Sequence, residues 1–403
     1  MKIALVLDGL QVGGVERVCL DYCKLLLDLG YKVTIFNLRP NLTALEKEIP
    51  EGVKIVHIPF SIWFTPERYT KLVKWNFIYK LVYFFAYIIF SCIDVVYKGY
   101  CKLRYKECRE NFDFAVSFSS HFNDLTFVAD HFIKAKNTVS WSHGAIYSYL
   151  LMSDGFINLY NKIKNIVVLV DDAQEEVLSY NQNLHLNIYK LYNPSFVKSR
   201  PVDNNKVEEL KRKYGKFILM VSRFKYPHKD QPTVIRAFDD FITNYKLNTN
   251  LVFIGDGPDK DQSEKIANNL SSNVRKRIHF LGTKLDVQNY YSAAYVLVHA
   301  SVAGEGLPTI MIEAMNYGIP EVVTDSKTGP REILGDNQYG LLCKVQNPKD
   351  MSKKLFKLFS DENLYKHYQS IERERVKDFS PKVIEKKLDY ILKDINKRGE
   401  KAK

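Results

Sequence analysis

The chain has 403 residues, of which 46% are hydrophobic and 26% charged, values that are ordinary for a soluble globular protein of about two domains. Its six cysteines show no C-x-x-C spacing, which excludes a recognisable zinc site or disulfide framework and favours a reducing, cytoplasmic compartment. The net charge of +12 favours anionic partners, but no nucleic-acid-binding module is recognisable. We therefore expect no nucleic acid, and instead a diphosphate-bearing substrate or an anionic membrane surface.

The first half of the chain alternates short β-branched runs with helical patterns, which predicts a parallel α/β domain over residues 1–195. It opens with a strand at Lys2–Asp8, not a signal peptide, and a helix from Val15 to Leu29. Gly13 and Gly14 between them let the backbone approach a ligand, although a plain turn needs the same glycines. The G-x-G-x-x-G spacing of dinucleotide enzymes is absent. The other expected strands are Tyr31–Asn37, Val53–Ile58, Asp113–Ser117, Thr138–Trp141, Ile166–Val170 and Leu186–Tyr192.

The segment Ser61–Glu110 differs from its surroundings, because it holds 14 aromatic residues and nine Lys or Arg against four Asp or Glu. Its centre, Leu81–Ile93 (LVYFFAYIIFSCI), is uncharged but shorter than the ~20 residues that a membrane-spanning helix needs. Basic and aromatic residues are interleaved on both sides, which is typical of a segment in the lipid headgroup layer. The alternative is two ordinary helices that pack their apolar sides on the sheet.

His143 is the candidate functional residue of the first domain. It follows the strand at Thr138–Trp141 and precedes Gly144, at the sheet edge where α/β domains place functional groups. A purely structural role is the alternative. His121 and His131 flank a helix and offer no such context. A polar stretch without periodicity, Ser195–Lys206, predicts the domain linker.

The second domain, residues 206–380, repeats the alternation and places two basic residues after its first strand. Arg223 stands at the end of the strand Phe217–Val221, and Lys229 begins the next helix. Each alone would be an ordinary solvated base. Together they can converge on a phosphate pair, with Arg bidentate and Lys a point charge. A further strand is expected at Tyr295–Ala300, and a basic helix runs from Lys382 to the end.

The most informative stretch is Glu305–Met315 (EGLPTIMIEAM), which predicts a helix entered from the strand Tyr295–Ala300. Pro308 suits the first helical position, where its missing N–H costs nothing. Gly306 and the unpaired N–H groups of the first turn form a place for an anion. Glu305 and Glu313 would accept hydrogen bonds from hydroxyls on either side. The alternative for each glutamate alone is an ordinary exposed side chain.

This stretch, with Gly318–Pro320 after it, resembles the C-terminal signature of the family 4 retaining glycosyltransferases, which have the two-domain GT-B fold. GGVERV, SRFKYPHKDQ, GDGP and GPREIL resemble further segments of that family, so the resemblance extends over nearly the whole chain. Leu251–Ile254 and Glu321–Thr324 match strands of the family, and Ile278–Gly282 matches the segment that meets the base. It implies two Rossmann-like domains, an acceptor-side domain at 1–195 and a nucleotide-sugar domain at 206–380. It also implies that residues 381–403 form a helix that crosses back to the first domain, and that GPREIL belongs to a closing loop.

The resemblance assigns roles to individual residues. Glu305 would meet the hydroxyls of the donor sugar, Arg223 and Lys229 would clamp the diphosphate, and His143 would lie over the donor sugar near the acceptor. Glu313 would hold the ribose, and the backbone at Leu281 would meet the base. The full set of implied donor-binding residues is Gly13, Gly14, Leu281, Gly306, Leu307, Pro308, Thr309 and Glu313.

We therefore expect a retaining transferase that moves a hexose or N-acetylhexosamine from a nucleotide diphosphosugar, UDP favoured over GDP, in cell-surface polysaccharide synthesis. The expected acceptor is a hydroxyl of a lipid-linked glycan at the inner face of the cell membrane. No metal and no cofactor are expected, because no D-x-D pair stands in a loop after a strand, and two cations with a helix N-terminus can balance the leaving charge. The alternatives are an inactive scaffold subunit and a sugar-nucleotide epimerase of similar fold.

Overall fold

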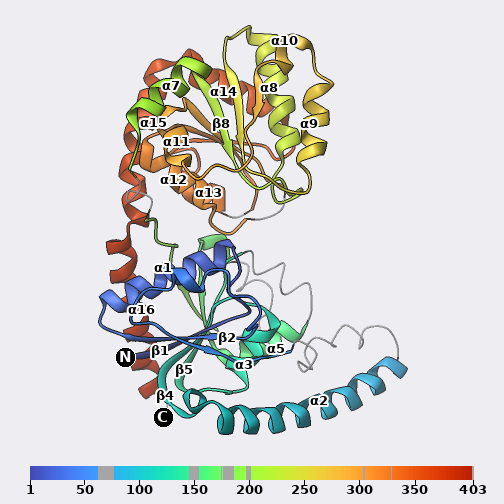
Figure 1. Cartoon of the computed structure of the whole chain (residues 1–403), viewed down its shortest axis with the longest axis vertical. Coiled ribbons are helices and arrows are strands. Elements are labelled where there is room, and N and C mark those ends of the chain that lie inside the picture. Colours follow the sequence, from blue (N-terminus) through green and yellow to red (C-terminus); the bar gives the residue numbers. More distant parts are fainter. Residues whose placement is uncertain are drawn as a thin grey trace. The chain divides into compact units, whose positions relative to one another are not determined.

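The computed structural model describes residues 1–61, 77–144, 154–173, 175, 186–196, 201–302, 305–327 and 329–401. The chain divides into two compact units (Figure 1). The first comprises Met1–Pro194 together with Pro381–Lys403, and the second comprises Ser195–Ser380. Each is a parallel sheet covered by helices, so the predicted α/β class with two parallel-sheet domains is confirmed. The predicted linker, Ser195–Lys206, falls in the second unit, and its residues 197–200 lie outside the described ranges.

Within the described residues, the sheet of the first unit has seven parallel strands in the order β3-β2-β1-β4-β5-β6-β7. The chain starts in the middle at β1, moves outward to β3 and returns to β4 on the other side of β1. The order of the strands therefore reverses between β1 and β4. Open α/β sheets bind ligands at the carboxyl ends of the strands at such a point. The strands are β1 (Lys2–Leu7), β2 (Lys32–Asn37), β3 (Lys54–His57), β4 (Asn111–Ser117), β5 (Lys134–Trp141), β6 (Asn165–Val168) and β7 (Asn187–Lys190).

Amphipathic helices cover this sheet. In α1 (Gly14–Asp28) the buried residues Val18, Tyr22, Leu25 and Leu26 recur at helical spacing and face the strands. The shorter helices α3 (Phe122–Ala129) and α5 (Asp154–Ile163) follow β4 and β5. A helix is expected from the sequence at Asp172–Tyr180, and most of that range lies outside the described residues. The described residues also include the short 3-10 helices η1 (Glu46–Glu48) and η4 (Lys106–Arg109) in this unit and η6 (Val376–Phe379) in the second.

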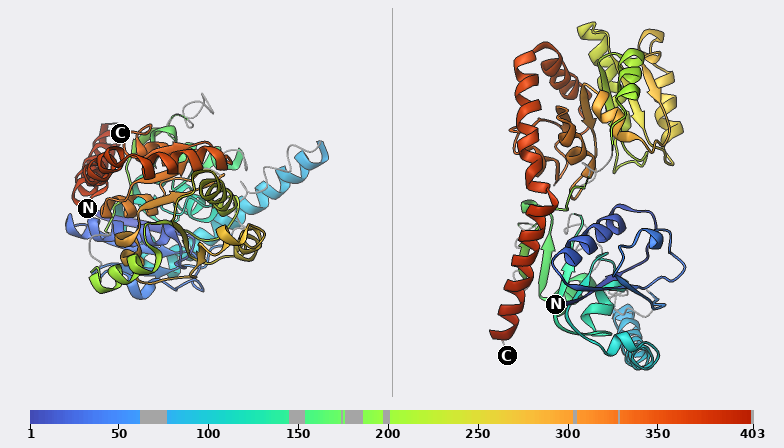
Figure 2. Two further views of the ribbon diagram at one scale, coloured as in Figure 1. Left: turned by 90° about the horizontal axis from the view of Figure 1, so that it is seen from above. Right: turned by 60° about the vertical axis from the view of Figure 1, so that its left-hand side comes forward.

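The last helix, α16 (Pro381–Lys401), belongs to the first unit, where it contacts β5 and α1 (Figure 2). Its buried side chains include Ile384, Leu388 and Ile395. Two acids on its other positions accept hydrogen bonds from tyrosines of the unit: Tyr31 donates to Asp389 at 2.5 Å, and Tyr189 donates to Asp394 at 2.9 Å. The helix is therefore an integral part of that unit.

Helix α2 (Phe77–Arg104) is continuous over 28 residues, so this part of the predicted aromatic segment is one helix and not two. Its second half packs on the first unit through buried Asp94 and Cys101. Its first half is exposed, and Phe77, Phe84 and Phe85 keep 57–72% of their surface. The helix from Lys80 to Arg104 is long and apolar enough to cross a membrane by length and composition, contrary to the reading of a short apolar run. Residues 62–76 of that segment lie outside the described ranges.

The described sheet of the second unit has six parallel strands in the order β10-β9-β8-β11-β12-β13. Alternate residues of its strands enter separate cores on the two faces, so that Met220 faces one core and Leu219 the other. The strands are β8 (Phe217–Val221), β9 (Asn250–Ile254), β10 (Ile278–Phe280), β11 (Val296–His299), β12 (Glu321–Thr324) and β13 (Leu341–Cys343). The helices are α7 (Asn204–Tyr214), α8 (Gln231–Tyr245), α9 (Lys260–Asn268), α10 (Ser272–Arg275), α11 (Val287–Ala293), α12 (Thr309–Tyr317), α13 (Gly329–Leu334), α14 (Pro348–Ser360) and α15 (Glu362–Arg375).

Two local predictions in the second unit are wrong. Helix α12 begins at Thr309, one residue later than expected, so Pro308 is its N-cap and not its first helical residue. The segment GPREIL forms the short helix α13 and not part of a loop, and strand β13 after it was not predicted. With only three residues, β13 offers too short an apolar run to separate from a loop by pattern.

Candidate functional site

Arg223 is held at the carboxyl edge of the second sheet by unusually close backbone packing. It follows β8 directly, and the turn after β9 lies against it. A Cβ atom on Gly255 would stand 2.0 Å from the Ser222 carbonyl oxygen, so only glycine permits this approach. The Phe224 N–H donates to the Asp256 carbonyl at 3.0 Å, which fixes the backbone on the far side of Arg223. The arginine side chain itself is exposed.

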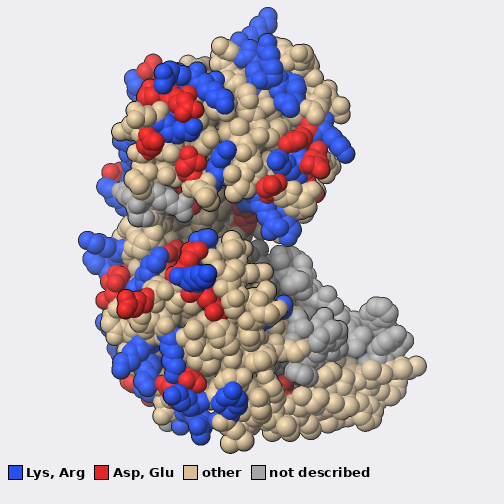
Figure 3. All heavy atoms as spheres, in the orientation of Figure 1, with Lys and Arg blue, Asp and Glu red and all other residues tan. Residues whose placement is uncertain are grey.

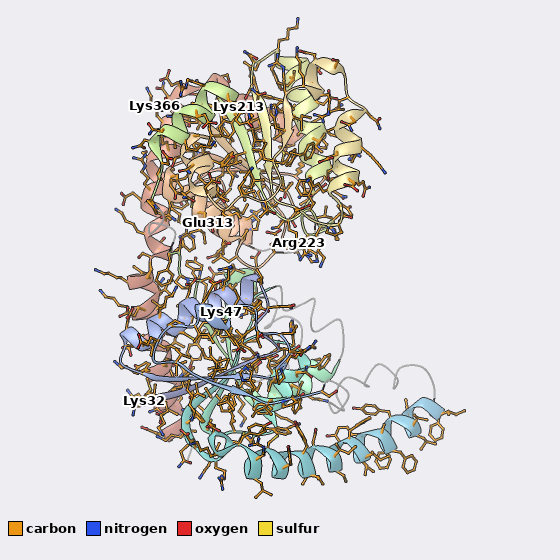
Figure 4. All side chains as sticks on the ribbon, viewed as in Figure 1. Lys32, Lys47, Lys213, Arg223, Glu313 and Lys366 are labelled. Atoms are coloured by element: carbon orange, nitrogen blue, oxygen red, sulfur yellow. The ribbon has the colours of Figure 1, made fainter. Side chains whose placement is uncertain are left out.

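Figure 4 places Arg223 and Glu313 at the same end of the second unit, away from Lys213 and Lys366. This is the end at which β8 and β11 finish. The guanidinium of Arg223 makes no hydrogen bond or ion pair within the described part of the chain. It is therefore available to a ligand.

Lys229, Glu305 and His299 meet at this edge of the sheet. The Lys229 ammonium forms an ion pair with the Glu305 carboxylate, and His299 Nε2 lies 3.0 Å from Glu305 Oε2. Lys229 Nζ lies 3.4 Å from the same imidazole nitrogen. Two backbone hydrogen bonds hold the loops together: Asp230 N–H donates to Ala300 at 2.8 Å, and Val302 N–H donates to Pro227 at 2.9 Å. The predicted pair Lys229 and Glu305 is thus brought into direct contact.

The three groups set one another's charge. Burial by itself would raise the pKa of Glu305, but the interactions with His299 and with Lys229 outweigh it and lower the pKa to about 2. Burial and the nearby Lys229 charge lower the pKa of His299, while Glu305 raises it. At neutral pH the site therefore holds an ionised glutamate beside a cationic lysine and a neutral histidine.

The turn Gly306–Thr309 leads from Glu305 into α12. Leu307 is buried, and Pro308 is the N-cap of the helix, with no side-chain hydrogen bond. The Met311 N–H donates to the Pro308 carbonyl at 3.1 Å, while the N–H groups of Thr309 and Ile310 have no acceptor within the helix. Helix α13 lies against this turn, since the Gly329 N–H donates to the Glu305 carbonyl at 3.2 Å. A Cβ atom on Gly329 would stand 2.0 Å from the Gly306 carbonyl oxygen, so this contact also requires glycine. The turn is a fixed frame suited to an anion.

Glu313 lies on α12 and is held by a buried tyrosine of α11. The Tyr291 hydroxyl donates to Glu313 Oε2 at 3.0 Å, and the Tyr291 ring stacks on Tyr317 with centroids 5.7 Å apart. Burial, and then the charge of Glu313, raise the pKa of Tyr291 well above its usual range, so the phenol stays a donor. Glu313 is half-buried and oriented. Its ribose-binding role stays a prediction.

Leu281 follows β10 and is half-buried. Its backbone N–H donates to the Phe253 carbonyl at 3.0 Å, and the Gly255 N–H donates to the neighbouring Gly282 carbonyl at 2.9 Å. These bonds place Leu281 beside the same turn that supports Arg223. A contact between its backbone and a base stays a prediction.

The remaining predicted residues belong to the first unit. Gly13 is the N-cap of α1, where a Cβ atom would stand 2.2 Å from Glu16 Oε2, while Gly14 has no atom within 4 Å of such a position. His143 follows β5, and its Nε2 lies 2.8 Å from the Phe118 carbonyl. Burial lowers the pKa of His143 to about 4, so it is neutral at physiological pH. Their roles stay predictions.

Sequence reasoning missed a polar cluster at the carboxyl ends of β1 and β4. Asp8 accepts two hydrogen bonds from Arg39, at 2.9 and 3.1 Å, and one from Asn123 at 2.6 Å. His121 Nδ1 lies 3.2 Å from the same carboxylate, whose pKa the three partners lower against the opposing effect of burial. The available signal was the position of Asp8 directly after the first strand. In the described ranges, no group of three or more His, Cys, Asp or Glu side chains is placed to hold a metal ion.

Comparison with known proteins relates the second unit to a family of glycosyltransferases. Residues 201–375 match the family described as Glycosyl transferases group 1. The N-acetylgalactosamine-N,N'-diacetylbacillosaminyl-diphospho-undecaprenol 4-alpha-N-acetylgalactosaminyltransferase of Campylobacter jejuni is 28% identical over 255 residues, 61% of this chain and 67% of that protein. The amylovoran biosynthesis glycosyltransferase AmsD of Erwinia amylovora is 30% identical over 176 residues, 43% of this chain and about half (47%) of that protein.

Solved structures match over almost the whole chain. The Anabaena protein Alr3699/HepE in complex with UDP and glucose has a TM-score of 0.70 at 17% identity, covering 98% of this chain and 100% of that one. TarM superposes with a TM-score of 0.72 at 15% identity, over 97% and 98% of the two chains. Such likeness confirms the predicted GT-B fold. Residues 201–375 are thus similar to the group 1 glycosyltransferases, and the two parallel sheets of the chain have the GT-B fold.

Proposed function

We propose that this glycosyltransferase moves a hexose or N-acetylhexosamine from a UDP-sugar to a hydroxyl of a lipid-linked glycan, with retention and without a metal ion. The observation that carries the proposal is the arrangement around Glu305. The ionised Glu305 carboxylate, Lys229 and the first turn of α12 lie together at the carboxyl edge of the second sheet. Arg223 lies at the same edge, after β8. Such a site offers cations and a helix N-terminus to a diphosphate, and an acceptor oxygen to sugar hydroxyls.

The donor and acceptor classes draw support from the relatives. Three Campylobacter jejuni relatives are named for transfer of N-acetylgalactosamine to diphospho-undecaprenol-linked sugars. Proteins of the same fold are described in complex with UDP, and one with UDP-glucose. These names favour UDP over GDP and a lipid-linked acceptor for this chain as well.

Retention is proposed because the stretch Glu305–Met315 resembles the signature of retaining glycosyltransferases, and we assign Glu305 to orienting the sugar and not to attacking it. Both of its oxygens already accept hydrogen bonds, from Lys229 and from His299. A carboxylate nucleophile in a double displacement must instead approach the anomeric carbon directly. Charge that develops on the leaving diphosphate would be stabilised by Arg223, by Lys229 and by the first turn of α12.

Contact with an anionic membrane is part of the proposal, and α2 supplies its support. In Figure 3 the arm formed by α2 is almost free of charged atoms on the face shown. Cys92, Ile93, Val96, Tyr97 and Tyr100 line a shallow apolar hollow along the helix. Basic residues follow at its carboxyl end, where Lys102 and Arg104 can meet lipid phosphates. We place the enzyme at the inner face of the cell membrane, where a lipid-linked acceptor resides.

The proposal is tested by incubating the protein with UDP- and GDP-sugars and a diphospho-undecaprenol-linked sugar in vesicles, and by determining the product's anomeric configuration. Arg223→Ala should reduce UDP affinity ~10- to 100-fold, the value of a lost charge-assisted hydrogen bond. The exposed neighbour Lys225 provides the control, since Lys225→Ala should leave UDP affinity unchanged. An inverted product would contradict retention. Free epimer from donor alone, or no turnover of any donor by a folded protein that binds UDP, would favour the epimerase or the scaffold.

A further inference from the structure

A fully buried histidine lies beneath the proposed donor site and has no role in it so far. His299 is the last residue of β11, and its side chain has no exposed surface. Its only hydrogen-bonding contacts in the described part of the chain are made through Nε2, while Nδ1 is buried without a partner. Because Nε2 faces a carboxylate, the proton belongs on Nε2, and the ring donates it to Glu305 Oε2.

The Glu305 carboxylate is therefore shared by two neighbouring donors. His299 reaches it from inside the sheet with 0% of its side chain exposed, and Lys229 reaches it from the surface side with 22% exposed. The lysine carries only donors, so it cannot accept from the imidazole at 3.4 Å, and both groups act on Glu305. Burial raises the pKa of Glu305, and both His299 and Lys229 lower it.

The two donors differ in what a bound diphosphate would do to them. Lys229 is the residue that the proposed function assigns to the donor phosphates, and a phosphate pair would draw its ammonium away from Glu305. His299 is enclosed by the core and stays in place. Without it, a carboxylate with only 10% of its side chain exposed would be left without its inner partner when the donor binds. Burial would then favour its protonated form.

We propose that His299 is a positioning residue, which holds the Glu305 carboxylate in place when Lys229 turns to the donor diphosphate. The inference rests on the proposed function and adds a division of labour within it. Lys229 exchanges the Glu305 carboxylate for the donor diphosphate, and His299 keeps that carboxylate oriented toward the sugar hydroxyls. Glu305 can then accept hydrogen bonds from the sugar in the same geometry with or without the diphosphate.

The test compares His299→Leu with His299→Gln, which keeps a side-chain N–H donor. In His299→Leu, kcat/KM for the sugar nucleotide should fall ~10-fold or more, as expected for a lost hydrogen bond to a charged group. UDP affinity at pH 8 should change less than about threefold. The acid limb of the rate profile should move to higher pH, and His299→Gln should restore most of both properties. His279→Leu is the control, because His279 bonds to Asn250 at 2.9 Å, outside this cluster.

A second readout needs no turnover. In His299→Leu, protonation of Glu305 on acidification should release Lys229, so UDP affinity at pH 5 relative to pH 8 should rise more than in the wild type. Equal profiles in the two proteins, or equal losses in the Leu and Gln variants, would overturn the role of His299. A wild type that binds UDP but transfers no sugar would contradict the proposed reaction and leave the binding comparison to decide on His299. A folded wild type that binds no UDP would overturn both.

Discussion

Glu305 stays ionised in the folded protein because His299 and Lys229 together outweigh the cost of burying its charge. A carboxylate whose pKa is about 2 accepts hydrogen bonds at any pH at which the enzyme works. Lys229, which we assign to the donor diphosphate, is paired with Glu305 in the free protein. The donor diphosphate and the Glu305 carboxylate therefore compete for Lys229. This competition predicts that a change at Glu305 affects UDP affinity and the rate of sugar transfer differently.

Replacing Glu305 with alanine should lower the rate of sugar transfer ~10- to 100-fold, because a charged acceptor for the sugar hydroxyls is lost. UDP affinity should stay equal to that of the wild type or rise, since Lys229 loses its competing partner. Transfer rates with a UDP-sugar and calorimetric titration with UDP measure the two effects separately. A parallel loss of both would contradict a role in sugar orientation.

The sequence predicted Arg223, Lys229 and Glu305 because charged residues directly after buried strands stand where α/β sheets bind ligands. It could not predict His299, which occupies the last position of an apolar strand and reads as core. Asp8 and His121 were missed for another reason. They are 113 residues apart, and only the pairing of β1 with β4 brings the ends of their strands together. Contacts of this kind depend on strand order, which one sequence does not contain.

At the scale of elements, the turn after β9 is built around a backbone that approaches its neighbour too closely for a side chain. Gly255 has φ +133°, a conformation that L side chains rarely adopt, and its Cβ position lies 2.0 Å from the Ser222 oxygen. Gly255→Ala should therefore destabilise the protein by ~1–3 kcal/mol and displace the segment that carries Arg223. UDP affinity should fall with it.

Thermal unfolding and UDP titration of Gly255→Ala are compared with those of Gly99→Ala. Gly99 lies in α2 with open space around its Cβ position, so alanine there should stabilise the helix by up to ~1 kcal/mol. It should leave UDP affinity unaffected. If Gly255→Ala bound UDP as tightly as the wild type, the close packing would have no part in positioning Arg223.

Helix α2 allows a direct test of membrane contact. Phe84, Phe85 and Ile88 are 57, 61 and 44% exposed, so the triple replacement by serine removes apolar surface without opening the core. The variant should lose binding to anionic vesicles in a flotation assay and should unfold at the wild-type temperature. Unchanged flotation would exclude this face of α2 as the anchor. A large drop in unfolding temperature would indicate that these residues pack within the protein.

Apart from β13, the strands were predicted to within a few residues, because runs of β-branched residues bounded by turn residues identify buried parallel strands. The length of helix α2, by contrast, was not predicted. Its first half is apolar around the whole circumference, so it has no polar face by which helical periodicity could be recognised. The sequence marks only where charges occur, at Lys80 and Asp94, and the helix continues past both. Asp94 is buried against the first unit and does not end the apolar surface.

At the scale of the whole molecule, pH acts on stability through a buried pair of acids in the second unit. Glu321 on β12 and Glu372 on α15 are both completely buried, and neither carboxyl has a hydrogen-bond partner among the described residues. Burial raises the pKa of Glu321, and burial with the charge of Glu321 raises that of Glu372, both well above the usual range. The folded protein therefore keeps protons at this pair that the unfolded chain releases.

The sign of the pH dependence follows from this difference. Above the unfolded pKa of about 4.5, the unfolded state gains by losing a proton that the folded state retains, so stability falls as pH rises toward the folded pKa. Glu321→Gln removes one of the titrating groups at nearly constant shape. It should raise the unfolding temperature by several degrees at pH 8, a gain of ~1–3 kcal/mol, and give little gain at pH 4. The exposed Glu208→Gln is the control, with no such dependence expected. An equal rise in unfolding temperature at pH 8 and pH 4 would contradict the raised pKa values of Glu321 and Glu372 in the folded protein.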